Sequence, residues 1–216
     1  MANFLMDKET EQIIDSQIVH VGERPITFER YLEMGQGQYV ELVNGVIVEK
    51  PMVQWDHETC MRWLYQVVGI YVNRRKLGEM VSSRIVVKVG EHAGRMPDLL
   101  FIKKGNLAIV QQKAVYGAPD LIIEIVLPND RLSHLRALET DYFRIGVPEL
   151  IFIDLRRQEI RRLLLRENEY EETLITSGTI SFESIEGLTL QTEWILQEPR
   201  PDELETVQAL LASSHA

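Results

Sequence analysis

The chain has 216 residues, 45% of them hydrophobic, which suits one domain with a substantial core. Its formal net charge of −10 argues against a surface that holds nucleic acid through a general excess of Lys and Arg, but does not exclude a local basic site. A single cysteine, Cys60, excludes an internal disulfide, and no stretch approaches the ~20 apolar residues of a membrane span, so we expect a soluble, cytoplasmic protein.

The N-terminal part of the sequence predicts an arm, a short helix and a β-hairpin. Residues 1–24 are polar and aperiodic, and we expect a flexible arm there. Residues 27–34 predict a short helix with Thr27 as its N-cap. Residues 38–50 contain two β-rich runs joined at Asn44-Gly45, the strongest short signal for a hairpin.

A long helix and three strands are predicted next. Apolar residues recur at helical spacing from Asp56 to Lys76, with Asp56 as the expected N-cap. Three strand candidates follow, at residues 82–90, 96–104 and 119–127. The third is apolar on both faces, which is typical of a central strand covered by helices on each side.

The C-terminal part predicts further strands and helices. A helix over residues 131–146 has one apolar face and ends at Gly146. A buried strand, an antiparallel pair and an acidic helix follow at residues 149–155, 158–176 and 201–213. Elements mixed in this order predict an α/β or α+β fold with a sheet flanked by helices. We assign residues 25–198 to the domain and residues 199–216 to a helical tail.

Two residues of the long helix have reactive side chains without a supporting motif. His57-Glu58 begins like a metalloprotease zinc motif, but the second histidine would have to stand at Met61. No base for a nucleophilic Cys60 is indicated nearby in the sequence. We therefore expect His57 and Cys60 to be packing residues.

Three acidic residues stand where a strand pattern favours apolar side chains: Glu41, Asp98 and Glu124. A buried carboxylate without a partner is costly. Carboxylates from neighbouring strands form an oxygen-rich pocket in which a hard cation such as Mg2+ or Mn2+ compensates their charge. The alternative for each acid is a separate arginine partner or a solvated strand end. Their joint occurrence favours the metal site.

The sequence also resembles a known nuclease family. Pro97-Asp98 followed by Glu124 is similar to the PD-(D/E)xK nuclease signature. The ordered set ELVNG, PDLLFI, PDLIIEIVLP, YFRIGVPEL and IFID resembles the Uma-type family of restriction endonucleases, from about Thr27 to about Leu190. The set is more specific than the Pro-Asp pair alone, because Pro119-Asp120 is a second such pair outside the matching position.

The resemblance implies a restriction-endonuclease-like core, a mixed β-sheet flanked by helices, with an additional β-hairpin. It implies that Asp98 and Glu124 bind Mg2+ or Mn2+ and that Glu41 completes or supports the site. The implied reaction is hydrolysis of DNA phosphodiester bonds. A homodimer is compatible with the resemblance.

The lysine of the signature is missing from its expected places. On the strand it would stand two residues after Glu124, at Val126. The resemblance to Uma-type sequences implies a second place on the following helix, at Leu138. Lys88 could reach the site from a neighbouring strand and is our candidate catalytic lysine, although a solvated edge-strand lysine is the favoured reading of it. The positive charge could instead come from an arginine, Arg131 or Arg136.

Two further features bear on activity. His134 could contact metal or water, but we favour a partly exposed helix histidine. Five arginines between residues 156 and 166 could hold a phosphate backbone, yet we favour salt bridges to nearby glutamates. The leading hypothesis is therefore a metal-dependent endonuclease. The alternatives are an inactive binding or assembly protein of the same fold and a metal-dependent hydrolase with another substrate.

Overall fold

The computed structural model describes residues 18–20, 25–34, 39–82 and 84–213. Most of the predicted N-terminal arm lies outside these residues. Its described part, strand β1 (Ile18–His20), pairs with β3 (Val46–Glu49). None of the helices in the described ranges has both the length and the apolar character that crossing a membrane requires.

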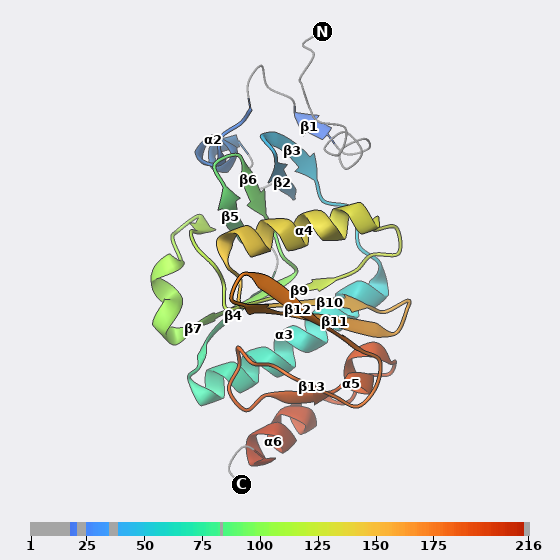
Figure 1. The fold of residues 1–216 in the computed structure, drawn as a ribbon. Helices are drawn as coiled ribbons and strands as arrows, with labels where there is room; N and C mark the ends of the chain where they lie inside the picture. Colours follow the sequence, from blue (N-terminus) through green and yellow to red (C-terminus); the bar gives the residue numbers. More distant parts are fainter. Residues whose placement is uncertain (1–17, 21–24, 35–38, 83, 214–216) are drawn as a thin grey trace.

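A six-stranded mixed sheet forms the centre of the molecule, between two long helices (Figure 1). Helix α3 (Trp55–Arg75) covers one face and α4 (Leu132–Ile145) covers the other. The strand order is β12-β11-β10-β9-β7-β4. In chain order these are β4 (Gly78–Ser82), β7 (Leu99–Lys103), β9 (Leu121–Ile125), β10 (Glu149–Asp154), β11 (Glu159–Arg166) and β12 (Glu169–Ile175).

Strand β9 is buried along its whole length, as the sequence predicts for a central strand. Leu121, Ile123 and Ile125 pack in the same core as α3, whereas Ile122 packs in the core under α4. Successive side chains of a strand point to opposite faces, so Glu124 shares the α4 face with Ile122. The neighbours of β9 are β10, which is parallel, and β7, which is antiparallel.

A second sheet lies beyond α4, at the top of Figure 1. Its order is β1-β3-β2-β6-β5-β8, and helix α2 (Phe28–Met34) packs on it through Phe28. The remaining strands are β2 (Val40–Val43), β5 (Val86–Gly90), β6 (Ala93–Arg95) and β8 (Ala114–Val115). The predicted hairpin is confirmed as β2 and β3. Asn44 and Gly45 at its turn have φ of 48° and 81°, which a tight hairpin turn requires.

Of the two predicted N-caps, the one of α2 is confirmed and the one of α3 is wrong. The backbone N–H of Arg30 donates to Thr27 Oγ1 at 3.3 Å, which confirms the cap of α2. The expected cap of α3 is wrong, because Gln54 holds the N-cap position and Asp56 lies in the first turn. There the carboxylate of Asp56 complements the positive end of the helix dipole.

The C-terminal segment packs on α3. It contains β13 (Thr179–Ser181), β14 (Thr189–Gln191), α5 (Thr192–Leu196) and α6 (Glu203–Ser213). Trp63 of α3 donates from Nε1 to the carbonyl of Pro201 at 2.8 Å, and Val207 and Leu210 of α6 join the α3 core. Short elements such as β13, β14, α5 and the 3-10 helix η1 (Lys104–Ile109) were not predicted. They are too short to show a hydrophobic period in sequence.

Candidate functional site

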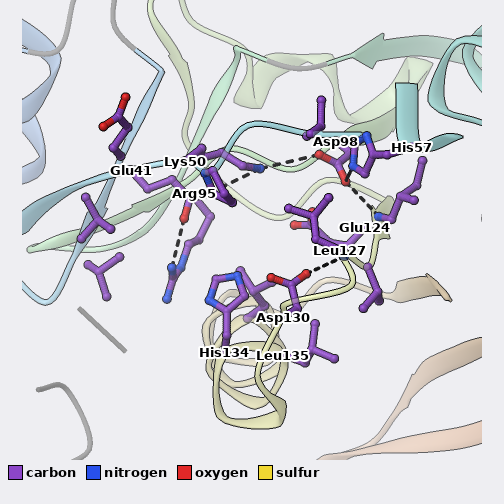
Figure 2. Close-up of a pocket in the computed structure, with 18 residues that line it drawn as sticks. Glu41, Lys50, His57, Arg95, Asp98, Glu124, Leu127, Asp130, His134 and Leu135 are labelled. Atoms are coloured by element: carbon purple, nitrogen blue, oxygen red, sulfur yellow. Dashed lines mark hydrogen bonds and ion pairs between the residues drawn. The ribbon is translucent and has the colours of Figure 1, made fainter. Parts of the chain in front are cut away.

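A pocket of about 70 Å³ opens where the two sheets meet the first turns of α3 and α4 (Figure 2). Such a volume holds an ion with a few waters. All three predicted acidic residues line it. Several further lining residues were not predicted to lie near these acids. The charged and titratable lining residues are Glu41, Glu49, Lys50, His57, Arg95, Asp98, Glu124, Asp130 and His134.

Glu124 reaches the pocket from the buried strand β9. The hydroxyl of Tyr142, on α4, donates to Glu124 Oε1 at 2.6 Å and so fixes the direction of the carboxylate. Burial and the nearby negative charge of Asp98 raise the pKa of Glu124 to about 8, against the opposing effect of Lys50. The pocket therefore tolerates a second negative charge poorly unless a cation enters.

Asp98 stands just before β7 and is held by three groups. Its Oδ2 accepts the backbone N–H of Ile125 at 2.8 Å and lies 3.1 Å from Nε2 of His57. The ammonium of Lys50 lies 3.6 Å from its Oδ1. Burial opposes ionisation of Asp98, but Lys50, His57 and the Ile125 N–H together hold its pKa below the usual range. Asp98 is therefore an ionised carboxylate in a fixed orientation.

Lys50 is the lysine of the pocket, and sequence reasoning missed it. Its Nζ donates to the carbonyl of Met96 at 2.6 Å and lies 3.9 Å from Glu41 Oε1. Burial alone would lower the pKa of this ammonium, but the charges of Asp98, Glu41 and Glu124 outweigh burial and raise it. Lys50 thus stays protonated.

The position of Lys50 explains why a search at the two expected places failed. Val126 and Leu138, where the nuclease pattern places lysine, line the same pocket as Lys50. Lys50 directly follows β3 and continues the alternation of Val46 and Val48. Val48 pairs with Glu41 on β2, and Lys50 stands two residues after Val48. The pairing of the two hairpin strands could therefore have placed Lys50 on the same side as Glu41.

Glu41 lines the pocket, but its carboxylate is already engaged. Arg95 Nη1 lies 3.1 Å from Oε2, and the backbone N–H of Met96 donates to Oε1 at 2.8 Å. Burial opposes the charge, yet Lys50, Arg95 and the Met96 N–H hold the pKa of Glu41 below its usual range. Glu41 thus has an arginine partner, which was the alternative to a metal ligand in the sequence analysis.

Lys88 is placed away from the pocket. Its ammonium lies 2.6 Å from Glu29 Oε1, and also over the rings of Phe28 and Tyr116. It is absent from the pocket lining in the part of the chain that the structure describes. The expectation that it reaches the acids is wrong, because β5 belongs to the second sheet and directs this side chain toward α2.

The expectation that His57 only packs is also wrong. It is 4% exposed, lines the pocket and contacts Asp98. Cys60, in contrast, is fully buried in the core, and burial raises the pKa of its thiol to about 12, so it is inert. His134 is more buried than expected. Burial lowers its pKa, and its imidazole is neutral at pH 7.

The pocket offers a limited set of metal ligands. Within the described ranges, no group of three or more His, Cys, Asp or Glu residues is arranged to hold a metal ion. Burial and the charge of Asp98 raise the pKa of Glu124, so a cation bound at these two acids would favour the ionised form of Glu124. Two carboxylates suit a hard divalent cation that keeps several waters, as Mg2+ does. The residues therefore fit a cation on Asp98 and Glu124 better than a three-carboxylate site.

The raised pKa of Glu124 predicts a pH-dependent loss of stability in EDTA. A carboxyl whose pKa is higher in the folded than in the unfolded protein stabilises the fold at low pH. That contribution is lost as pH rises from the ordinary value of ~4.3 through about 8. We expect Glu124→Gln, which mimics the protonated acid, to gain stability over wild type between pH 5 and pH 8, on the order of a few kcal/mol.

Urea unfolding at several pH values measures this difference. Glu172→Gln is the control, because the hydrogen bond from Arg161 lowers the pKa of Glu172 and a neutral side chain there brings no gain at pH 8. If the stability of the wild-type protein relative to Glu124→Gln were the same at pH 5 and at pH 8, this would contradict the raised pKa of Glu124.

Comparison with known proteins identifies the family and a similar fold. Residues 27–196 match the model of the Uma2 family, described as "Putative restriction endonuclease". The crystal structure of a protein from Anabaena variabilis ATCC 29413, described as "a putative nuclease belonging to DUF820", is similar with a TM-score of 0.63 and 16% identity. The match covers 86% of this chain and 99% of that one. No curated protein gives a significant match. The family resemblance and the restriction-endonuclease-like fold predicted from sequence are thus confirmed.

Proposed function

The chain belongs to the Uma2 family, and from this we propose that it is a nuclease that hydrolyses DNA phosphodiester bonds with Mg2+ or Mn2+ at the Asp98–Glu124 pair. The observation that carries the proposal is the position of Lys50, whose Nζ lies 3.6 Å from Asp98 Oδ1 in the pocket that Glu124 also lines. A buried lysine on which the charges of both acids act supplies the group whose absence from Val126 and Leu138 left catalysis open.

The proposed roles follow from the charge state of each side chain. Asp98 and Glu124 would hold the cation, which when bound polarises the phosphoryl group and lowers the pKa of its water. Lys50 remains an ammonium, so it stabilises negative charge that develops on the phosphoryl oxygens and does not act as a base.

Three other residues would position these groups. His57 and the Ile125 N–H orient Asp98, and Tyr142 orients Glu124. Such outer contacts hold ligands in one geometry and lower the entropy lost on binding. His134, neutral at pH 7, can accept a hydrogen bond from water in the pocket. Glu41 supports the site indirectly by fixing Arg95 and the Met96 backbone.

Plasmid cleavage tests the proposal. We expect purified protein to nick or linearise DNA with Mg2+ or Mn2+, to lose this activity in EDTA, and to lose it in Asp98→Ala and in Glu124→Ala. Calorimetric titration with Mn2+ provides a second measurement, in which both variants should lose the heat of binding. Cleavage that survives both substitutions would contradict the site.

An inactive binding or assembly protein is the second candidate. The engagement of Glu41 by Arg95, which takes one of the three predicted acids away from a cation, favours it. The two candidates differ in the same experiments. An inactive relative would cleave no DNA or RNA substrate with either metal, and a Mn2+ titration would show whether it had kept the cation site.

A further inference from the structure

A larger groove adjoins the candidate site. Its volume is about 750 Å³, within the range of ~300–1,000 Å³ typical of ligand sites. It lies between the start of α4 and the turn that joins β10 to β11. The groove and the pocket share Val126, Leu127, Asp130 and Leu135 as a common wall. A polymer whose reacting bond lies in the pocket can therefore continue into the groove.

Two of the groove's arginines are neutralised by acidic neighbours. Arg161 lies 2.7 Å from Glu139 and 2.9 Å from Glu172. Arg157 lies 3.6 Å from Asp154 and 3.5 Å from Glu159. These contacts confirm the salt bridges that the sequence favoured over a continuous basic stripe. They also engage every acidic residue of the groove lining except Asp130.

The other two arginines of the groove are differently placed. Arg136 on α4 and Arg156 on the β10–β11 turn are exposed. Neither guanidinium forms an ion pair with a residue in the described part of the chain. A guanidinium that is exposed and uncommitted to a carboxylate binds phosphate through two parallel N–H donors. One arginine stands on each of the two elements that border the groove, so a strand between them can contact both.

We propose that this groove holds the DNA strand next to the scissile bond and that Arg136 and Arg156 bind its phosphates. The inference rests on the proposed nuclease function and adds the path of the substrate. In a chain of net charge −10, two local cations beside the pocket provide attraction that the surface as a whole lacks. The contacts are to the backbone, so they position DNA without reading its sequence.

The test compares Arg136→Gln/Arg156→Gln with a charge-matched control, Arg74→Gln/Lys76→Gln. The control residues are exposed at the C-terminal end of α3, whereas the pocket lies at its N-terminal end. Binding of a fluorescein-labelled 20-base-pair DNA is followed by anisotropy from 50 to 200 mM NaCl. Steady-state cleavage with Mn2+ gives KM and kcat.

The groove variant should raise KM and the dissociation constant by roughly tenfold and leave kcat at saturating DNA unchanged. Its slope of log affinity against log salt should fall by about 1.8, from two lost phosphate contacts at about 0.9 each. The control variant should change neither. Unchanged KM and salt slope in an active groove variant would overturn the inference alone. Wild-type protein that binds no DNA overturns it too, and wild-type binding without cleavage overturns only the nuclease function.

Discussion

Replacement of Lys50 by methionine is expected to lower kcat for DNA cleavage by about 100-fold to 1,000-fold, the usual effect of removing one charge-stabilising group. Methionine keeps the length of the apolar stem and removes the ammonium next to Asp98 and Glu41. The same change removes one buried cation from both carboxylates, which keep Arg95 and His57 as partners, so the free energy of unfolding should fall by about 3 kcal/mol, the lower end for breaking a buried pair.

A second substitution separates the chemical role of Lys50 from its structural one. Leu138 lines the same pocket, so Lys50→Met/Leu138→Lys returns an ammonium from α4 and should recover at least part of kcat. Lys88→Met is the matched control and should leave kcat unchanged, because Lys88 pairs with Glu29 outside the pocket. Wild-type kcat in Lys50→Met, or a large loss in Lys88→Met, would contradict the assignment of Lys50.

Arg95→Met is expected to be the most destabilising of the substitutions considered, by about 3–5 kcal/mol. Arg95 is 2% exposed and binds two buried carboxylates, with Nε 2.8 Å from Asp141 Oδ2 and Nη1 3.1 Å from Glu41 Oε2. Through these contacts it joins β2 of the second sheet to α4, which covers the central sheet. Methionine would remove the buried cation that the two charges share, leaving Asp141 with the exposed Arg144 and Glu41 with Lys50 at 3.9 Å.

Arg144→Met is the natural control for this measurement. Arg144 binds the other oxygen of the same carboxylate, Asp141 Oδ1, at 2.9 Å, but its side chain is 51% exposed. Exposed ion pairs contribute at most about 1 kcal/mol, so we expect a small loss. Urea unfolding at pH 7 measures both variants. Equal losses would show that burial does not determine the strength of the Asp141 pairs.

The sequence was informative where a signal is local or periodic. The Asn44-Gly45 turn, the apolar faces of α3 and α4 and the all-apolar run of β9 each depend on a few consecutive residues, and the structure has them as predicted. Asp98 and Glu124 were found because a carboxylate interrupting an apolar strand is itself an anomaly.

The cation of the pocket could not be found in this way. Lysines within strands or directly after them are common and most are solvated, so residue type and strand position alone do not separate Lys50 from Lys88. The difference between them arises from the sheet to which each strand belongs and from the direction in which it points. Lys50 points to Asp98 at 3.6 Å, and Lys88 points to Glu29 at 2.6 Å.

The sequence by itself thus determined the longer helices and the central strand, the family and two carboxylates that line the candidate site. Tertiary structure decided which charges meet: His57 with Asp98, Arg95 with Glu41, and Lys50 with both acids. The physical reason is that burial and charge compensation depend on contacts between different elements, some of them far apart in the chain, such as His57 and Asp98 with a separation of 41 residues. Hydrophobic periodicity indicates only which face of each helix or strand is buried, and not which charged residues of other segments it meets.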